Sequence, residues 1–204
     1  FPILTGDACR IAEQHGVELE HMDYVQIHPT CLYSKKPGRS FLISESARGE
    51  GAILLNHKGE RFVNELLPRD VVTKAIHEEM EKEGVDHEFI SFENVPEEII
   101  KGHFPHIYEK CLEEGYDILK EPAPIVPAQH YFMGGVHVDH DSETTMPHLY
   151  AVGETSCNGV HGKNRLASNS LLESLVFAKR AAQKIELTQK GKEEHESNYH
   201  AACC

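Results

Sequence analysis

The chain has 204 residues, of which 40% are hydrophobic and 26% charged, and its formal net charge at pH 7 is −13. A chain of this length can bury a sizeable core in one large domain or two small ones. The acidic balance argues against nucleic acid as the main partner, and no apolar run is long enough to span a membrane. No secretion signal opens the chain, and its six cysteines and fifteen histidines show no metal-ligand spacing. We therefore expect a cytoplasmic protein with reduced thiols and no bound metal.

Hydrophobic periodicity and turn residues predict regular elements over most of the first 120 residues. Asp7 is expected to cap the first helix, and Pro29 is expected to end the first strand. Pro105 is expected to break the helix predicted over 96–115. In the helix that opens at Pro68, Val71 is among the residues expected to point inward. The predicted elements are a helix over 7–15, a strand over 23–29, a hairpin over 48–64, a helix over 68–84, a strand over 87–92 and a helix over 96–115.

The composition changes after residue 119. Residues 120–129, KEPAPIVPAQ, contain three prolines and are expected to form a stiff crossing between domains. Short strands are predicted within 130–139 and 148–154, where the sequence turns apolar again beside glycines.

The last predicted helix runs from about residue 167 to 188. Ser170 and Glu173 are expected to form a capping-box pair at its start. Residues 188–204 are polar, and we expect them to hold no folded element. One face of the helix is predicted to be broadly apolar and is formed by Leu171, Leu172, Leu175, Val176 and Ala178.

This layout predicts a mixed α+β module that is inserted into another domain. The module covers 22–128, and pieces of the second domain cover 1–21 and 129–187, with the polar tail over 188–204. Because the chain opens at Phe1 rather than at a methionine, we also expect it to be part of a longer protein.

Residues 160–177, VHGKNRLASNSLLESLVF, place an unusual number of hydrogen-bond donors at the start of a predicted helix. The backbone N–H groups of a helix start attract anions, and the planar fork of Arg165 suits a carboxylate. The alternative is an ordinary helix cap beside a surface arginine. The donor-bearing residues are His161, Lys163, Asn164, Arg165, Ser168, Asn169 and Ser170.

Further candidates lie in the first 130 residues. Arg69 opposes the dipole of the helix that it opens, so either it faces an anion in a cleft or Asp70 offsets its charge. His28 and His130 each lie at the end of a predicted strand near a proline. Each is either a ligand-binding histidine or a hydrogen-bonded structural one. Arg48 lies in the motif SESARGEGA, where it is either part of an anion-binding site or part of a salt-bridged turn. Together these arginines, histidines and the helix start suggest a pocket for a dicarboxylate.

Seven motifs in order make the chain similar to a known family. They are HPT, SESARGEGA, GERFVN, PRDVV, PAQHYFMGG, LYAVGE and HGKNRLASNSLLE. This series resembles the succinate dehydrogenase/fumarate reductase flavoprotein family, and NRLASNSLLE resembles its L-aspartate-oxidising branch, because the dehydrogenases usually have glycine in place of Ala167. The resemblance extends to about Ile185 and implies a capping domain, 22–128, inserted in an FAD-binding α/β domain.

The resemblance also implies roles for individual residues. His28 and His130 match histidines that contact the substrate carboxylates, and Thr30 lies beside the first of them. Arg165 matches an arginine that clamps a carboxylate, and Arg48 one that orients the substrate.

The residue that matches the family's proton-transfer arginine is Arg69. Because a free guanidinium has a pKa above about 12, an electrostatic clamp, with water or the substrate amine carrying the proton, stays open as its role. On the flavin side, Glu154 matches a partner of the ribityl hydroxyls. Asn169 belongs to the cofactor-binding set, and Ser170 and Leu171 match residues whose backbone N–H groups face the flavin ring.

The implied activity is the oxidation of L-aspartate, or another C4 dicarboxylate, to iminoaspartate with non-covalent FAD, oxygen or fumarate serving as acceptor. It would be the first step of NAD biosynthesis, with a possible hand-off to quinolinate synthase. Alternatives are a fumarate reductase or succinate dehydrogenase flavoprotein subunit, and a non-catalytic domain that binds dicarboxylates or a partner protein.

Two departures from the family pattern concern the cofactor and the helix start. No GxGxxG turn for the FAD pyrophosphate occurs in the chain, so we expect the 204 residues alone to retain little FAD. Lys163 also stands where a small residue is usual.

Overall fold

The computed structural model describes residues 4–36 and 38–202, and the side chains up to residue 190. The described residues divide into two compact units, one over Gln26–His130 and one formed by residues 4–25 together with residues 131–202. Residues 1–3 of the expected first domain piece, and Cys203 and Cys204 of the expected tail, lie outside the described residues. Over the described part of the chain, no helix combines the length and the apolar character that crossing a membrane requires.

The first unit is built on a four-stranded sheet with the order β2-β5-β4-β3. The strands β3, β4 and β5 pair antiparallel, with Leu54 opposite Ile90 and Phe89 opposite Pro124. The strand bounds are β2 Val25–Leu32, β3 Ile53–Leu55, β4 Glu88–Ser91 and β5 Ala123–Phe132.

Prolines cause the main differences from the expected strands. β2 continues to Leu32, so the prediction that Pro29 ends it is wrong. Residues 120–129 are not a stiff crossing, because most of them belong to β5, which contains Pro124 and Pro127. Proline lacks a backbone donor but keeps its carbonyl acceptor, and Pro124 O accepts a hydrogen bond from Tyr33 N at 2.9 Å. A proline is therefore compatible with a strand where its missing N–H is not required.

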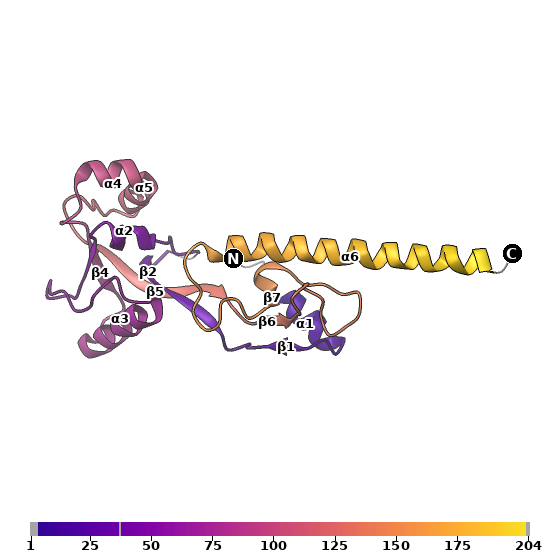
Figure 1. The fold of residues 1–204 in the computed structure, drawn as a ribbon. Coiled ribbons are helices and arrows are strands. Elements are labelled where there is room, and N and C mark those ends of the chain that lie inside the picture. Colours follow the sequence, from indigo (N-terminus) through magenta and orange to yellow (C-terminus); the bar gives the residue numbers. More distant parts are fainter. Residues whose placement is uncertain (1–3, 37, 203–204) are drawn as a thin grey trace. The chain divides into compact units, whose positions relative to one another are not determined.

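Four helices pack on this sheet, with α3 on one side of the strands and α4 and α5 on the other (Figure 1). α3 begins after Pro68 and ends at Gly84, whose φ of 68° is the left-handed conformation that glycine adopts at helix ends. Val72 and Ile76 are fully buried, but Val71 is 42% exposed, so its inward placement was wrong. The helix bounds are α2 Glu45–Gly49, α3 Arg69–Glu83, α4 Glu97–His103 and α5 Pro105–Glu113.

The predicted hairpin over 48–64 forms only in part. Residues 45–49 are helical, and β3 is followed by a turn and a single bridge between Leu55 and Arg61. Asn56 closes that turn, since its Oδ1 accepts hydrogen bonds from the backbone N–H groups of Lys58 and Glu60 at 3.0 and 2.9 Å. Hydrogen bonds from backbone N–H groups to the Asn56 side chain thus replace the longer ladder of backbone hydrogen bonds that a hairpin over 48–64 would have.

A continuous apolar core stabilises the first unit. It joins the inner faces of the sheet and the helices, and seventeen of its residues are buried, which is a substantial core for a unit of about one hundred residues. Its fully buried members include Ile43, Leu54, Val72, Ile76, Ile90, Cys111 and Ile125.

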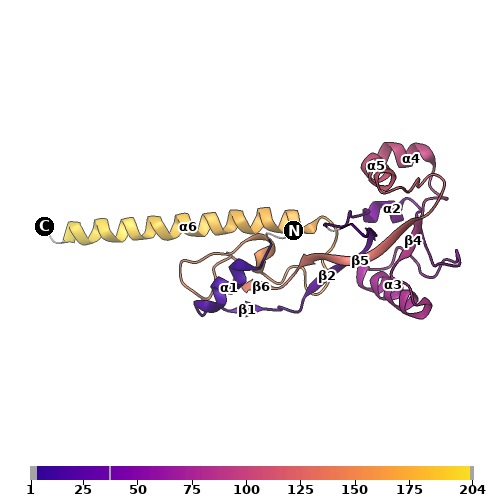
Figure 2. The same ribbon diagram turned by 180° about the vertical axis from the view of Figure 1, so that it is seen from behind.

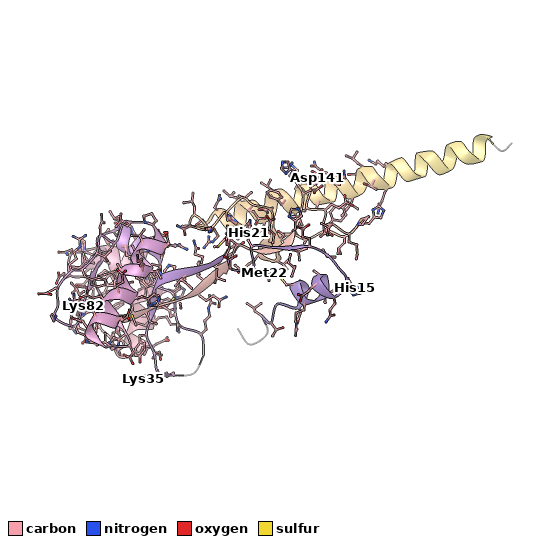
Figure 3. All side chains as sticks on the ribbon, turned by 90° about the horizontal axis from the view of Figure 1, so that it is seen from below. His15, His21, Met22, Lys35, Lys82 and Asp141 are labelled. Carbon is pink, nitrogen blue, oxygen red and sulfur yellow. The ribbon has the colours of Figure 1, made fainter. Side chains whose placement is uncertain are left out.

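A carboxyl group is buried at the edge of this core. Glu88 in β4 is 0% exposed, and neither of its carboxyl oxygens has a hydrogen-bond partner in the described structure. Burial raises the pKa of Glu88 to about 7; nearby His57 opposes the rise, and Glu83 and Glu79 add to it. Lys82, labelled in Figure 3, also opposes it. The folded state therefore favours the protonated form of Glu88.

Replacing Glu88 with Gln should make stability less dependent on pH. Between the ordinary pKa of glutamate and about 7, the folded chain holds a proton that the unfolded chain has lost, so wild-type stability falls as pH rises through this window. Above pH 7 the Glu88→Gln variant should be more stable by up to about 3 kcal/mol, and the difference should shrink toward pH 5. Thermal unfolding against pH measures this, with the exposed Glu78→Gln as control; equal pH dependence of wild type and Glu88→Gln would contradict it.

The second unit contains a three-stranded sheet with the order β1-β6-β7. β1 pairs antiparallel with β6, and β6 pairs parallel with β7. Gly6 rather than Asp7 is the N-cap of α1, and the Asp7 carboxylate accepts a hydrogen bond from Thr5 Oγ1 at 2.9 Å. The elements are α1 Asp7–Gln14, β1 Leu19–Glu20, β6 Gly135–His137, the 3-10 helix η1 Gly153–Thr155, β7 Ser156–Cys157 and α6 Asn169–Ala202.

The last helix, α6, is longer than expected. It continues to Ala202, so the expectation that 188–204 holds no folded element is wrong for the described residues; glutamate, lysine and glutamine in this stretch are good helix formers. Its second half extends beyond the other elements of its unit (Figure 2). The expected capping box is also wrong, because Ser170 and Glu173 both lie inside the helix, where Ser170 Oγ accepts from Arg165 and Glu173 from Asn158.

The predicted apolar face of α6 is exposed. Leu171, Leu172, Leu175 and Val176 are 71%, 64%, 71% and 50% exposed. A contiguous exposed apolar surface of this kind is typical of an interaction surface.

The consecutive glycines at 134 and 135 allow the strands of this unit to approach closely. A Cβ added to Gly134 would lie 2.0 Å from the carbonyl oxygen of His21, which is labelled in Figure 3. A Cβ added to Gly135, whose φ is 136°, would lie 2.3 Å from Thr155 O. Both contacts are with backbone atoms, which cannot move aside as a flexible side chain can.

Gly134→Ala should therefore destabilise the second unit by at least about 3 kcal/mol, because a methyl group cannot fit against a carbonyl oxygen. Gly159→Ala is the control, since Gly159 has a φ of 78° but nothing within 4 Å of an added Cβ. It should cost only about 1 kcal/mol of backbone strain. Thermal unfolding compares the two variants, and equal losses would show that contact at Gly134 is not the limiting factor.

Candidate active site

His28 and Thr30 lie side by side in the buried part of β2. His28 is 1% exposed, and its Nδ1 accepts a hydrogen bond from Thr30 N at 3.2 Å. A neutral His28 ring therefore carries its proton on Nε2. From this nitrogen it can donate a hydrogen bond to a carboxylate. Thr30 Oγ1 donates to Ile43 O at 3.0 Å, so the Thr30 hydroxyl proton is already used within the protein.

His130 in β5 contacts His28. Their ring centroids are 5.2 Å apart and the rings meet edge to face at 64°. The structure thus brings together two histidines that are 102 positions apart in the sequence, as the dicarboxylate hypothesis requires.

Arg48 in α2 is the most deeply buried of the predicted site arginines, with its side chain 1% exposed. Its Nη1 donates to Glu65 O at 2.6 Å, whereas its Nε and Nη2 have no hydrogen-bond partner in the described structure. Glu45 Oε1 lies 4.0 Å from Nη2. Burial lowers the pKa of Arg48; Glu45 opposes this and Arg69 adds to it. A buried cation with unsatisfied donors favours the binding of an anion.

Arg69 is buried at the start of α3, where it is held by two side chains that the sequence reasoning did not assign. Its Nε and Nη2 donate to Glu45 Oε2 at 2.8 and 2.6 Å, and its Nη1 donates to Gln26 Oε1 at 3.1 Å. Glu45 is thus a carboxylate that its guanidinium contacts. A signal for Gln26 was present, because residues 26 and 28 lie on the same face of a strand.

Arg165 is buried immediately before α6 in the second unit. Its guanidinium lies over the ring of Tyr131, with 4.7 Å between its Cζ and the ring centroid. Its Nη1 donates to Leu166 O at 3.2 Å and to Ser170 Oγ at 3.3 Å. With a relative exposure of 6%, this is not the surface arginine of the alternative interpretation.

The residues predicted to contact flavin are partly used within the chain. Glu154 in η1 accepts a hydrogen bond from Phe132 N at 2.9 Å, and Leu171 N donates to Ser168 O at 3.3 Å. Asn169 and Ser170 are half-buried at the start of α6. The partial positive charge of this helix start fits the edge of a flavin ring, which becomes negative on reduction.

The family to which the chain belongs can be stated from comparison with known proteins. It belongs to the FAD binding domain family, whose model matches residues 1–171. This confirms the resemblance to flavoproteins drawn from the seven motifs, and the mixed α+β fold agrees with it.

Curated relatives and solved structures place the chain more closely within flavoproteins. It is 56% identical over 184 residues to an L-aspartate oxidase of Clostridium perfringens and 43% identical over 196 residues to a chloroplastic L-aspartate oxidase of Oryza sativa. A fumarate reductase structure from E. coli matches 96% of the chain and 40% of its own chain, with a TM-score of 0.78 and 35% identity. A quinol-fumarate reductase structure matches 89% of this chain and 35% of its own chain, with a TM-score of 0.81 and 38% identity. The region matched to the C. perfringens relative is 90% of this chain and 42% of that relative. The region matched to the O. sativa relative is 89% of this chain and 30% of that relative. The chain therefore spans less than half the length of either protein.

Proposed function

We propose that the chain is part of an FAD-dependent enzyme, here called the whole protein, that oxidises L-aspartate to iminoaspartate. The observation that carries the proposal is the presence of buried arginines, above all Arg48 with two unsatisfied donors, in a chain similar to L-aspartate oxidases. A dicarboxylate supplies the anionic oxygens that such guanidinium groups bind.

The first unit supplies donors for a carboxylate. His28 Nε2, His130 and Arg48 would bind and orient the substrate. The guanidinium of Arg69 is fixed in place by its two hydrogen bonds to Glu45, which supports a role as an electrostatic clamp on charge that develops at the reacting carbons.

The second unit supplies a further carboxylate clamp and the contacts to the ring end of FAD. Arg165 would bind a substrate carboxylate, Glu154 the ribityl chain, and the start of α6 at Asn169, Ser170 and Leu171 the flavin ring. When bound, FAD supplies the acceptor for the hydride from the substrate Cα, and oxygen or fumarate then takes the electrons.

Several finer features belong to the same proposal. Residues 22–128 would be the capping domain, inserted in an FAD-binding domain to which 1–21 and 129–187 contribute. The pyrophosphate turn that this chain lacks would come from another segment, which would also cover the exposed leucines of α6. A cytoplasmic location and transfer of the product to a quinolinate synthase would follow from a role in NAD biosynthesis.

A product assay on the whole protein tests the proposal. We expect iminoaspartate and peroxide from L-aspartate under air. A protein that instead interconverts succinate and fumarate with a quinone or dye, and leaves L-aspartate untouched, would be the fumarate reductase alternative. A protein that binds dicarboxylates without converting them would be the non-catalytic alternative.

A further inference from the structure

Next to Arg165 lies a cluster of buried and half-buried side chains to which the proposed function gives no role. Its members come from β5, from the loop before α6 and from the second turn of α6, and all belong to one compact unit. They are Tyr131, Asn158, His161 and Glu173.

The Cζ atom of Arg165 lies over the ring of Tyr131, 4.7 Å from the ring centroid. A guanidinium donates hydrogen bonds only in its own plane. An aromatic ring that contacts the cation through its own face restricts where the guanidinium can lie and takes none of its donors. The hydrogen bonds from Nη1 to Leu166 O and Ser170 Oγ, at 3.2 and 3.3 Å, fix its rotation within that plane.

The ring of Tyr131 is in turn held by His161. The two rings meet at 89° with centroids 5.7 Å apart. His161 Nε2 lies 3.9 Å from Glu173 Oε2, and the side chains of His161 and Glu173 are 7% and 2% exposed. Asn158 Nδ2 donates to Glu173 Oε1, which holds the carboxylate from its other side.

The electrostatics of the cluster identify how Tyr131 acts. Burial, followed by Glu173 and Glu154, raises the pKa of Tyr131 to about 12, while Arg165 opposes the rise. Tyr131 thus stays a neutral phenol and is not a phenolate counter-ion for Arg165. Its interaction with the cation is through the face of the ring.

We propose that Tyr131 is a positioning residue whose ring face holds the Arg165 cation, so that its donors are aimed at the substrate carboxylate, and that His161 and Glu173 hold the Tyr131 ring. This rests on the proposed function, which assigns Arg165 to carboxylate binding. It adds a residue that never touches the substrate yet sets the affinity for it.

The first test measures binding without turnover. Isothermal titration of the whole protein with succinate gives the Kd of a C4 dicarboxylate, and the FAD content of each variant is measured alongside. Tyr131→Leu should raise Kd about tenfold or more with unchanged FAD content, whereas Tyr131→Phe, which keeps the ring, should restore wild-type Kd. A Kd for Tyr131→Phe as poor as for Tyr131→Leu would overturn the role of the Tyr131 ring.

A matched control is available in the same unit. Tyr24 also lies over a cation, with Lys163 Nζ 5.1 Å from its ring centroid. Tyr24→Leu removes the same kind of contact from Lys163 instead of Arg165 and should leave the Kd for succinate within about twofold. A loss equal to that of Tyr131→Leu would show that neither effect is specific to Arg165.

A second series avoids variants that fail to fold. Phenylalanines carrying increasing numbers of fluorine atoms, incorporated at position 131, keep the ring shape while weakening its attraction for a cation. The Kd for succinate should rise step by step along the series, and a flat series would overturn the proposal. If the wild-type protein does not bind succinate at all, the proposed function itself fails; if Arg165→Ala abolishes binding and the series stays flat, only the role of Tyr131 fails.

Discussion

Arg165→Ala in the whole protein should reduce kcat/KM for L-aspartate by about 30- to 1,000-fold. Arg165 is 6% exposed and its Cζ lies over the ring of Tyr131, so its removal would delete the proposed desolvated, charge-assisted contact with a substrate carboxylate. Removing one partner of such a pair costs roughly 2–4 kcal/mol. Steady-state kinetics with L-aspartate measure the loss, and the Kd of succinate should rise in parallel.

The chemistry of the replacement distinguishes a clamp from a simple charge. Arg165→Lys should also be poor, because an ammonium group cannot make two parallel hydrogen bonds to one carboxylate. Arg180→Ala is the control in the same unit, since Arg180 is 42% exposed and its Nε lies 3.7 Å from Asp141 Oδ1. Ordinary kinetics for Arg165→Ala, or equal losses at the two positions, would remove Arg165 from the substrate site.

The second large effect is expected at Arg69. Arg69→Leu should lower kcat by roughly 10²- to 10³-fold, the usual effect of removing a preorganised charge at a reacting centre, and should leave FAD content unchanged. Glu45, its ion-pair partner, is 41% exposed and can be solvated by water when the arginine is gone. Turnover at saturating L-aspartate and the flavin-to-protein ratio are the two measurements.

A structural arginine provides the contrast. Arg61 is 54% exposed, and its Nη2 lies 2.5 Å from an oxygen of the buried Glu65. Arg61→Leu leaves that buried carboxylate without its cation, so it should lower the melting temperature with little change in kcat. If Arg69→Leu behaved in the same way, or lost its FAD, Arg69 would be a structural residue.

The fold was predictable where local chemistry decides it. Pro68 and Gly84 frame α3 because one suits a helix start and the other its left-handed end. Pro29 and Pro124 misled the strand predictions, because whether a strand tolerates proline depends on which N–H groups its neighbours require. That information lies in the pairing and not in the residue.

The candidate site was predictable in its arginines and histidines but not in the groups that hold them. Arg69 and Glu45 are 24 positions apart, and no periodicity links them; α2 and α3 bring them to 2.6 Å. Tyr131 and Arg165 are similarly linked only by the fold. Motifs thus identified charged residues, and the three-dimensional structure was needed to identify their partners.

The central proposal, that the whole protein takes a hydride from Cα of L-aspartate, is tested most directly by flavin absorbance in the absence of oxygen. L-aspartate should bleach the visible flavin band in a single phase, and L-aspartate deuterated at Cα should do so several times more slowly. Succinate should bind without bleaching it. A band that L-aspartate leaves unchanged, or that succinate bleaches instead, would contradict the assignment.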